Sequence, residues 1–227
     1  MHSLQAVNYC SVACQKVHRP KHKKECWKRA AEIFDEALFK QPPPREDCPI
    51  CFLPLPSVDQ IIYQSCCGKT LCNGCILEMV TETCAVICPF CREPPAASDE
   101  ERIGKYNKRM EAGDAIAFQE LGQNYITGHW GLPQDSNKAL KLMQSAIELG
   151  SIDADLNIAD IYKYGFFYSE RDLKIAIYHY QHAAMGGNEA SRYNNGVSES
   201  KAGNIKRAVK HWMIATGAGY KDSLENI

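Results

Sequence analysis

The sequence predicts small cysteine-built domains followed by an all-α solenoid of helix pairs. All 12 cysteines of the 227-residue chain lie between Cys10 and Cys91, so only that part of the chain requires thiols. The part that follows has no cysteine and repeats its own pattern of alanine, glycine and tyrosine. Apolar residues make up 45% of the chain and charged residues 23%, which is ordinary for a folded protein and excludes a disordered chain.

The N-terminus carries no charged start followed by an apolar run, and no stretch approaches the ~18 apolar residues that a bilayer span requires. We therefore expect an intracellular protein, cytoplasmic or nuclear, with no membrane partner. Cysteines in a reducing compartment bind metal more often than they form disulfides. The formal net charge is −1, yet residues 1–30 hold seven basic residues and one acidic residue. We interpret this basic end as a solvated face beside a metal site, with nucleic-acid binding as a minor alternative, because it lacks interleaved aromatic residues.

The central domain, predicted over 47–95, is the densest in cysteine. Its thiols form three CxxC pairs and one adjacent pair: Cys48 and Cys51, Cys72 and Cys75, Cys88 and Cys91, and Cys66 with Cys67. Eight thiolates are enough for two tetrahedral zinc ions, and four thiolates around one ion leave no position for water. A segment of about 45 residues is too short for a self-sufficient core, whereas structural zinc contributes ~10–16 kcal/mol in peptides. The sequence therefore predicts two structural zinc ions that hold this domain together.

The order CPIC, CC, CxxC and CPFC resembles a RING finger. RING fingers interleave their ligands, so the resemblance implies two sets: Cys48, Cys51, Cys72 and Cys75, and then Cys66, Cys67, Cys88 and Cys91. Lys69 stands where the usual histidine lies, so Cys67 is taken as a ligand, as in all-cysteine variants. Two adjacent ligands predict a strained local backbone. Cys84 is left over and is interpreted as a free thiol; the alternative is that it replaces Cys66.

RING fingers of the ubiquitin-ligase type hold a ubiquitin-charged conjugating enzyme and promote transfer to lysine without a covalent intermediate of their own. The resemblance implies that Ile50 and Pro89 contact the conjugating enzyme, while Arg92 bridges enzyme and ubiquitin. A guanidinium suits that task because its donors can face two partners. The alternatives are core packing for Ile50 and a solvated surface for Arg92. Met79 stands where many active members have tryptophan.

The N-terminal domain, predicted over 1–40, contains four further candidate metal ligands: Cys10, Cys14, His22 and Cys26. They resemble the second half of a MYND zinc finger. The first half of that pattern is not found in the residues before Cys10. Three interpretations stay open, namely one Cys₃His zinc or none, a poorly ordered remnant, or an incomplete version of a longer protein. An amphipathic helix is expected from Trp27 onward, and the linker 41–46 ends it because proline has no amide donor.

The third domain, predicted over 103–227, contains internal repeats. A shift of 37 residues places Ala117, Leu121, Gly122, Tyr125 and Gly128 on Ala154, Ile158, Ala159, Tyr162 and Gly165. A third copy has lost five residues from its loop, and Asn195 replaces an apolar residue, which predicts a frayed or terminal first helix. The pattern resembles SEL-like repeats, relatives of tetratricopeptide repeats, and implies an α-solenoid that binds other proteins. His179 and His182 are interpreted as polar solenoid positions rather than a metal site, because the repeat places no acidic partner.

The combined expectation is a RING-type ubiquitin ligase that recruits a charged conjugating enzyme through the RING and an unknown protein substrate through the repeats. The alternative is a non-catalytic interaction scaffold. We expect two zinc ions in the central domain, zero or one at the N-terminus, and no catalytic residue on this chain.

Overall fold

The computed structural model describes residues 19–57, 60–84, 86–165 and 171–227, with side chains from residue 27 onward. The chain divides into two units, residues 1–41 and residues 42–227. In the first unit the described element is helix α2 (Arg19–Leu38), which begins eight residues before the amphipathic pattern at Trp27. Residues 41–46 have no regular secondary structure, as expected for the proline run. The predicted domain boundaries stay predictions.

The second unit begins with a small cysteine-rich region. Strands β1 (Ile61–Gln64) and β2 (Lys69–Cys72) pair antiparallel, with Ile61 opposite Cys72, and helix α3 (Asn73–Thr83) follows directly. The buried core cluster of this region consists of Cys48, Leu71 and Cys75, and Cys88 is buried as well. So small a core cannot offset the conformational entropy of the region, which therefore requires cross-links.

Helix α4 (Asp99–Glu111) connects this region to the repeats and is an element that the sequence analysis does not predict. Its N-cap is Ser98, whose hydroxyl accepts a hydrogen bond from the amide of Glu101 at 3.2 Å. The first turn is acidic and the last turn contains Lys108 and Arg109, an arrangement that complements the helix dipole. α4 packs against the first repeat helix.

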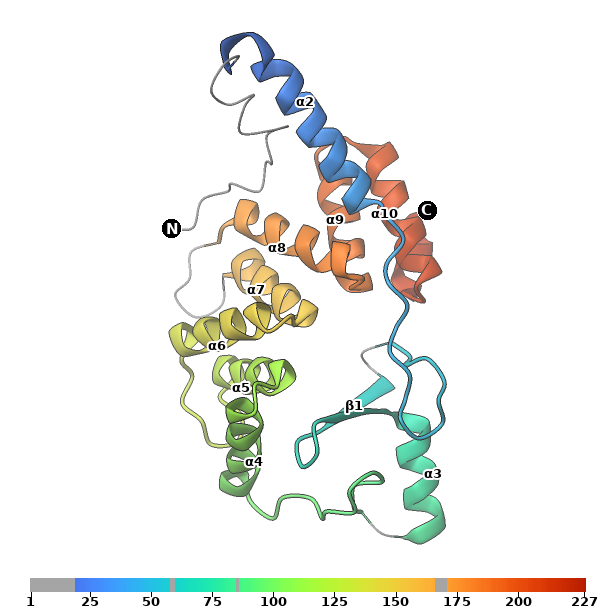
Figure 1. The fold of residues 1–227 in the computed structure, drawn as a ribbon, viewed down its shortest axis with the longest axis vertical. Helices are drawn as coiled ribbons and strands as arrows, with labels where there is room; N and C mark the ends of the chain where they lie inside the picture. The colour runs from blue at the N-terminus through green and yellow to red at the C-terminus, as the bar shows by residue number, and fades with distance from the viewer. Residues whose placement is uncertain (1–18, 58–59, 85, 166–170) are drawn as a thin grey trace. The chain divides into compact units, whose positions relative to one another are not determined.

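Six helices form three antiparallel pairs, which follow one another along the chain (Figure 1). The pairs are α5 (Ala115–Thr127) with α6 (Ser136–Glu148), α7 (Ile152–Tyr164) with α8 (Leu173–Gly186), and α9 (Glu189–Lys201) with α10 (Ile205–Gly217). A short 3₁₀ helix, η2 (Lys221–Asn226), packs on α10. Among the described residues, no helix is long and apolar enough to cross a membrane.

Capping residues set the 37-residue spacing. The first helix of each copy starts after a residue whose side chain accepts a hydrogen bond from a backbone amide, namely Asp114, Ser151 and Asn188. Gly128 and Gly165 end α5 and α7 with φ angles of 72° and 70°, a conformation that is unfavourable for residues with a β-carbon. The repeat is therefore encoded by helix boundaries as well as by apolar positions.

Buried alanines let the paired helices approach closely. Ala139 and its counterparts Ala176 and Ala208 are at most 1% exposed. A larger side chain at these positions would overpack the interface. The third copy is regular: α9 has 13 residues and Asn195 is 2% exposed, so the expectation of a frayed helix is wrong. Helix α9 is ordered because α10 packs along it.

Candidate metal centre

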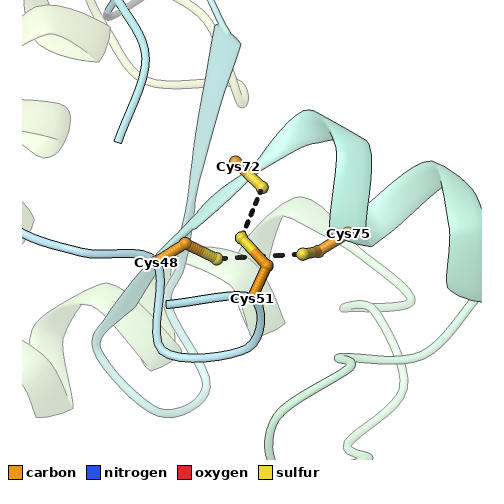
Figure 2. Close-up of side chains that lie close together, drawn as sticks. All are labelled: Cys48, Cys51, Cys72 and Cys75. Carbon is orange, nitrogen blue, oxygen red and sulfur yellow. Dashed lines mark hydrogen bonds between the residues drawn. The ribbon is translucent and has the colours of Figure 1, made fainter. Parts of the chain in front are cut away.

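Two groups of four cysteines stand out in the part of the chain that the structure describes. Within each group the sulfur atoms all lie within 4.8 Å of one another. The groups are Cys48, Cys51, Cys72 and Cys75, and Cys66, Cys67, Cys88 and Cys91. In Figure 2, two side chains of the first group come from the loop before β1, and the other two come from the β2–α3 junction. The members of the groups alternate in pairs along the chain, as the resemblance implied.

The first CxxC pair lies in a tight turn that its own backbone closes. The amide of Cys48 donates to the carbonyl of Leu53 at 2.8 Å, and the amide of Phe52 donates to the carbonyl of Cys48 at 2.9 Å. Phe52 has a φ of 57°, the left-handed conformation that allows the chain to turn back after Cys51.

The last CxxC pair repeats this geometry. The amide of Cys88 donates to the carbonyl of Glu93 at 2.8 Å, and the amide of Arg92 donates to the carbonyl of Cys88 at 2.8 Å. Arg92 has a φ of 63°. Two separate segments thus form the same turn, each presenting two thiols on one side of the backbone.

The β1–β2 hairpin supplies thiols to both groups. Its turn contains Cys66 and Cys67, and β2 ends at Cys72. The strain expected at the adjacent cysteines is not observed: neither appears among the described residues with positive φ, whereas Gly68 takes that conformation with a φ of 70°. The amide of Gly68 donates to the carbonyl of Gln64 at 2.7 Å, which closes the turn. Glycine tolerates this conformation without a steric penalty.

The sulfur distances fit tetrahedral zinc. Cys48 and Cys75 are 3.9 Å apart, as are Cys51 and Cys72. In the second group the distances are 3.8 Å between Cys67 and Cys88 and 3.4 Å between Cys66 and Cys91. Zn–S bonds of ~2.3 Å in a regular tetrahedron place the sulfurs ~3.8 Å apart, whereas a disulfide requires ~2.05 Å. All described cysteines are free thiols.

The electrostatics of the groups favour a cation. Burial acts to raise the pKa of the Cys48 thiol, but backbone amides at Cys72, Cys51 and Ile50 lower it to about 6. Burial, and then the neighbouring thiols, raise the pKa of Cys75 well above its usual range. Burial likewise raises the pKa of Cys67, to about 11. Four neighbouring thiolates repel one another, and a bound divalent ion is what stabilises all four in the ionised form.

The residues expected to contact a partner are accessible. Ile50 is 36% exposed, so it does not serve as simple core packing; Pro89 is half-buried and Arg92 is exposed. Phe52 and Leu53 are 76% and 64% exposed, and neither was among the residues expected to contact a partner. Their position directly after a CxxC turn is the signal that could have revealed them.

The remaining candidates are placed as follows. Cys84 is exposed at the end of α3 with a φ of 53° and belongs to neither group, whereas Cys66 does belong to one. Met79 is half-buried on α3. The side chains of the N-terminal candidates lie outside the described residues; these are Cys10, Cys14, His22 and Cys26.

The two solenoid histidines do have an acidic partner, contrary to the sequence analysis. Asp155 on α7 is 2% exposed, and its carboxylate accepts from His179 Nδ1 at 2.8 Å and from His182 Nδ1 at 2.5 Å. Burial acts to raise the pKa of Asp155, but the two imidazoles lower it. The hydrogen bond to Asp155 raises the pKa of His182. The three side chains tie α8 to α7, a contact that the repeat pattern does not predict because residue 118 in the first copy is phenylalanine.

Comparison with protein families finds two kinds of module in the chain. The MYND finger matches residues 4–26, and the Sel1 repeat matches residues 119–151 and 152–188. The crystal structure of a Sel1 repeat protein from Oxalobacter formigenes superposes with a TM-score of 0.52 at 23% identity, covering 56% of this chain and 53% of that one. The predicted fold class is confirmed: a cysteine-rich, zinc-binding N-terminal region precedes an all-helical Sel1-like solenoid.

Two of the curated relatives match a short stretch of the chain. The chain is 43% identical over 69 residues to E3 ubiquitin-protein ligase DA2 of Arabidopsis thaliana, covering 29% of this chain and 16% of that protein. It is also 43% identical over 66 residues to E3 ubiquitin-protein ligase GW2 of Oryza sativa subsp. indica, covering 28% of this chain and 15% of that protein. The chain thus spans about a sixth of the length of these relatives. Its modules are a zinc finger of the MYND class and Sel1 repeats, the latter a protein-interaction module.

Proposed function

We propose that this protein is a RING-type ubiquitin ligase whose central region holds one zinc ion in each group of four cysteines. The observation that carries the proposal is the alternation of the two groups along the chain, with both groups sharing one hairpin. Each ion would be fully coordinated by thiolates and would serve to hold the fold, because no open position remains for water. The two relatives named as E3 ubiquitin-protein ligases support the same class.

The two CxxC turns would form the surface that binds a ubiquitin-conjugating enzyme. Ile50 directly precedes the second cysteine of the first pair and is exposed, whereas Pro89 directly follows the first cysteine of the last pair and is half-buried. Arg92 follows the last cysteine, where its guanidinium can donate to the enzyme and to ubiquitin together. Exposed Phe52 and Leu53 extend the apolar surface. An exposed apolar patch lowers solubility, so its presence supports a role in binding another protein.

The chemistry would occur on the bound partners. The conjugating enzyme carries ubiquitin as a thioester, and a lysine amine attacks it, so that an amide forms while the enzyme's thiol leaves. The ligase lowers the barrier by fixing the orientation of ubiquitin before attack. The Sel1-like solenoid would bind the protein substrate, in the cytoplasm or nucleus.

Discharge of ubiquitin-charged conjugating enzymes by the purified full chain tests this proposal. We expect faster discharge of at least one enzyme to free lysine, and a loss of about tenfold or more in Ile50→Ala and in Arg92→Ala. Ile175→Ala is the matched control, because Ile175 on α8 is 37% exposed, close to the 36% of Ile50. Arg29→Ala on α2 controls for the loss of a surface guanidinium.

The ligase proposal fails if no enzyme in the panel is discharged faster than in buffer, or if Ile50→Ala and Arg92→Ala discharge as fast as their controls. The first outcome would instead favour a non-catalytic scaffold. Salt-sensitive nucleic-acid binding that disappears when residues 1–30 are removed would point to the basic N-terminus.

A further inference from the structure

Glu189 departs from the repeat pattern. It is the first residue of α9, and a shift of 37 residues aligns it with Ile152 in the second copy and Ala115 in the first. The repeat fold therefore does not require an acid at this position. The Glu189 side chain is nevertheless only 8% exposed, and a buried carboxylate is costly without a partner.

Arg45 provides that partner from 144 positions away in the sequence. Its Nη2 donates to Glu189 Oε1 and to the carbonyl of Ala218, each at 2.9 Å. Ala218 caps the C-terminal end of α10, where the helix dipole favours a cation. The solenoid thus offers a carboxylate and a helix end to one guanidinium.

The prolines before Arg45 lie against the same part of the solenoid. Gly187, with a φ of 107°, ends α8, and a β-carbon there would lie 3.1 Å from Pro42 Cβ and 3.7 Å from Pro43 Cδ. The missing side chain allows the rings of Pro42 and Pro43 to approach. The short segment Pro42–Arg45 therefore lies on the junction between α8 and α9, through apolar contact at one end and through charge at the other.

The segment does not fill the space around it. A cleft of about 430 Å³ lies beside it, with mostly apolar walls that include Pro44, Leu55, Ile116, Ile152 and Gly186. Ile152 is 37% exposed there, although it occupies the position equivalent to Glu189. The cleft has room for side chains that this chain does not supply.

We propose that the α8–α9 junction and the cleft beside it bind a proline-rich segment of a partner protein that carries an arginine, and that Pro42–Arg45 lies on this junction as an internal ligand that a partner segment would displace. Such segments are pre-extended and lose little conformational entropy on binding. The carboxylate of Glu189 selects for arginine through charge-assisted hydrogen bonds. This inference rests on the proposed substrate-binding role of the solenoid, and it names the class of segment that the solenoid recognises.

A labelled peptide of sequence QPPPRE, which is residues 41–46, provides the test by fluorescence polarisation on the full chain. A tethered ligand has an effective concentration of about 1 mM, so wild-type protein should bind the free peptide weakly. Arg45→Ala removes the internal competitor, and we expect its affinity for the peptide to rise at least about tenfold. Replacing the peptide's arginine by alanine, or adding Glu189→Gln to Arg45→Ala, should return binding to the wild-type level.

Arg45→Ala also leaves Glu189 without its cation, so a second variant is needed in case the first does not fold. Pro43→Gly with Pro44→Gly keeps the arginine but loosens the segment, and this variant should also bind the peptide more tightly than wild type. Arg29→Ala should behave as wild type. The inference is overturned if neither folded variant gains affinity, or if the gain is unchanged by Glu189→Gln.

The discharge assay separates this inference from the ligase proposal. Active discharge without peptide binding would contradict only the cleft, and peptide binding without discharge would contradict only the ligase.

Discussion

The guanidinium of Arg109 lies so close to the backbone of Gly68 that a β-carbon at residue 68 would come within 1.9 Å of Arg109 Nη2. The same guanidinium donates through Nε and Nη2 to Asp114 Oδ2, at 3.0 and 2.9 Å. The hydroxyl of Tyr63 donates to that oxygen at 2.7 Å. Because Asp114 also caps α5, one carboxylate joins the β1–β2 hairpin to the solenoid.

This junction is partly buried and keeps its protonation state. Burial, and then the bond to Asp114, raise the pKa of Tyr63 well above its usual range, so the hydroxyl remains a donor at neutral and mildly alkaline pH. Tyr106 lies between Tyr63 and Trp130, with ring centroids 5.9 and 5.1 Å away. The aromatic contacts and the shared carboxylate together hold the cysteine-rich region against α4 and α5.

Gly68→Ala should weaken this junction. A residue with a β-carbon in the left-handed conformation lowers the free energy of unfolding by about 1–2 kcal/mol, and displacement of the Arg109 guanidinium lowers it by ~1–3 kcal/mol more. Chemical denaturation measures the sum. Gly131→Ala is the control, because Gly131 has a similar φ of 67° and no described heavy atom lies within 4 Å of its added β-carbon. Equal losses in the two variants would show that the contact with Arg109 contributes nothing.

Removal of zinc should unfold the cysteine-rich region and leave the solenoid helical. The core cluster of this region has three buried residues, two of them cysteines, whereas the solenoid has its own buried core of alanine and larger apolar residues. Limited proteolysis and far-ultraviolet circular dichroism after chelation would distinguish the two parts. We expect new cleavage within 47–95 and little change in the helical signal. Intact mass under non-denaturing conditions should give two zinc ions from this region, and a metal-free folded protein would contradict the assignment.

The contact of Asp155 with His182 predicts a pH dependence of stability. The lowered pKa of Asp155 stabilises the fold above about pH 4, and this contribution is lost as the pH falls through the folded pKa. The raised pKa of His182 stabilises the fold below about pH 6.5, and this contribution is lost as the pH rises through the folded pKa. The contact is therefore strongest between these values.

The His182 side chain is 54% exposed, so solvent screening keeps the effect small. We expect the melting temperature to fall by at most about 2–4 °C as this contribution is lost between pH 6 and pH 8. His182→Ala should flatten that slope, and His129→Ala, at an exposed position outside the contact, should not. A slope that survives His182→Ala would place its origin elsewhere.

Most of the fold could be predicted from local sequence patterns. The helix pairs follow from alanine, glycine and capping residues at 37-residue spacing, and the cysteine pairs follow from CxxC spacing. What the sequence could not reveal are contacts between distant positions. Tyr63 and Asp114 are 51 residues apart, and Arg45 and Glu189 are 144 residues apart, so neither pair has a local signature. The prediction of backbone strain at Cys66 and Cys67 was wrong, because Gly68 adopts the left-handed conformation that the turn requires.

The hairpin that contributes Cys66, Cys67 and Cys72 has a consequence for how metal is lost. Because the β1–β2 hairpin carries ligands of both groups, a change in its backbone at one group alters the ligand geometry of the other. If each group holds one ion, as we propose, half-loaded protein is disfavoured and the two ions should leave in a single concerted step. Since the same hairpin presents Tyr63 to Asp114, demetallation would also release the solenoid from its anchor.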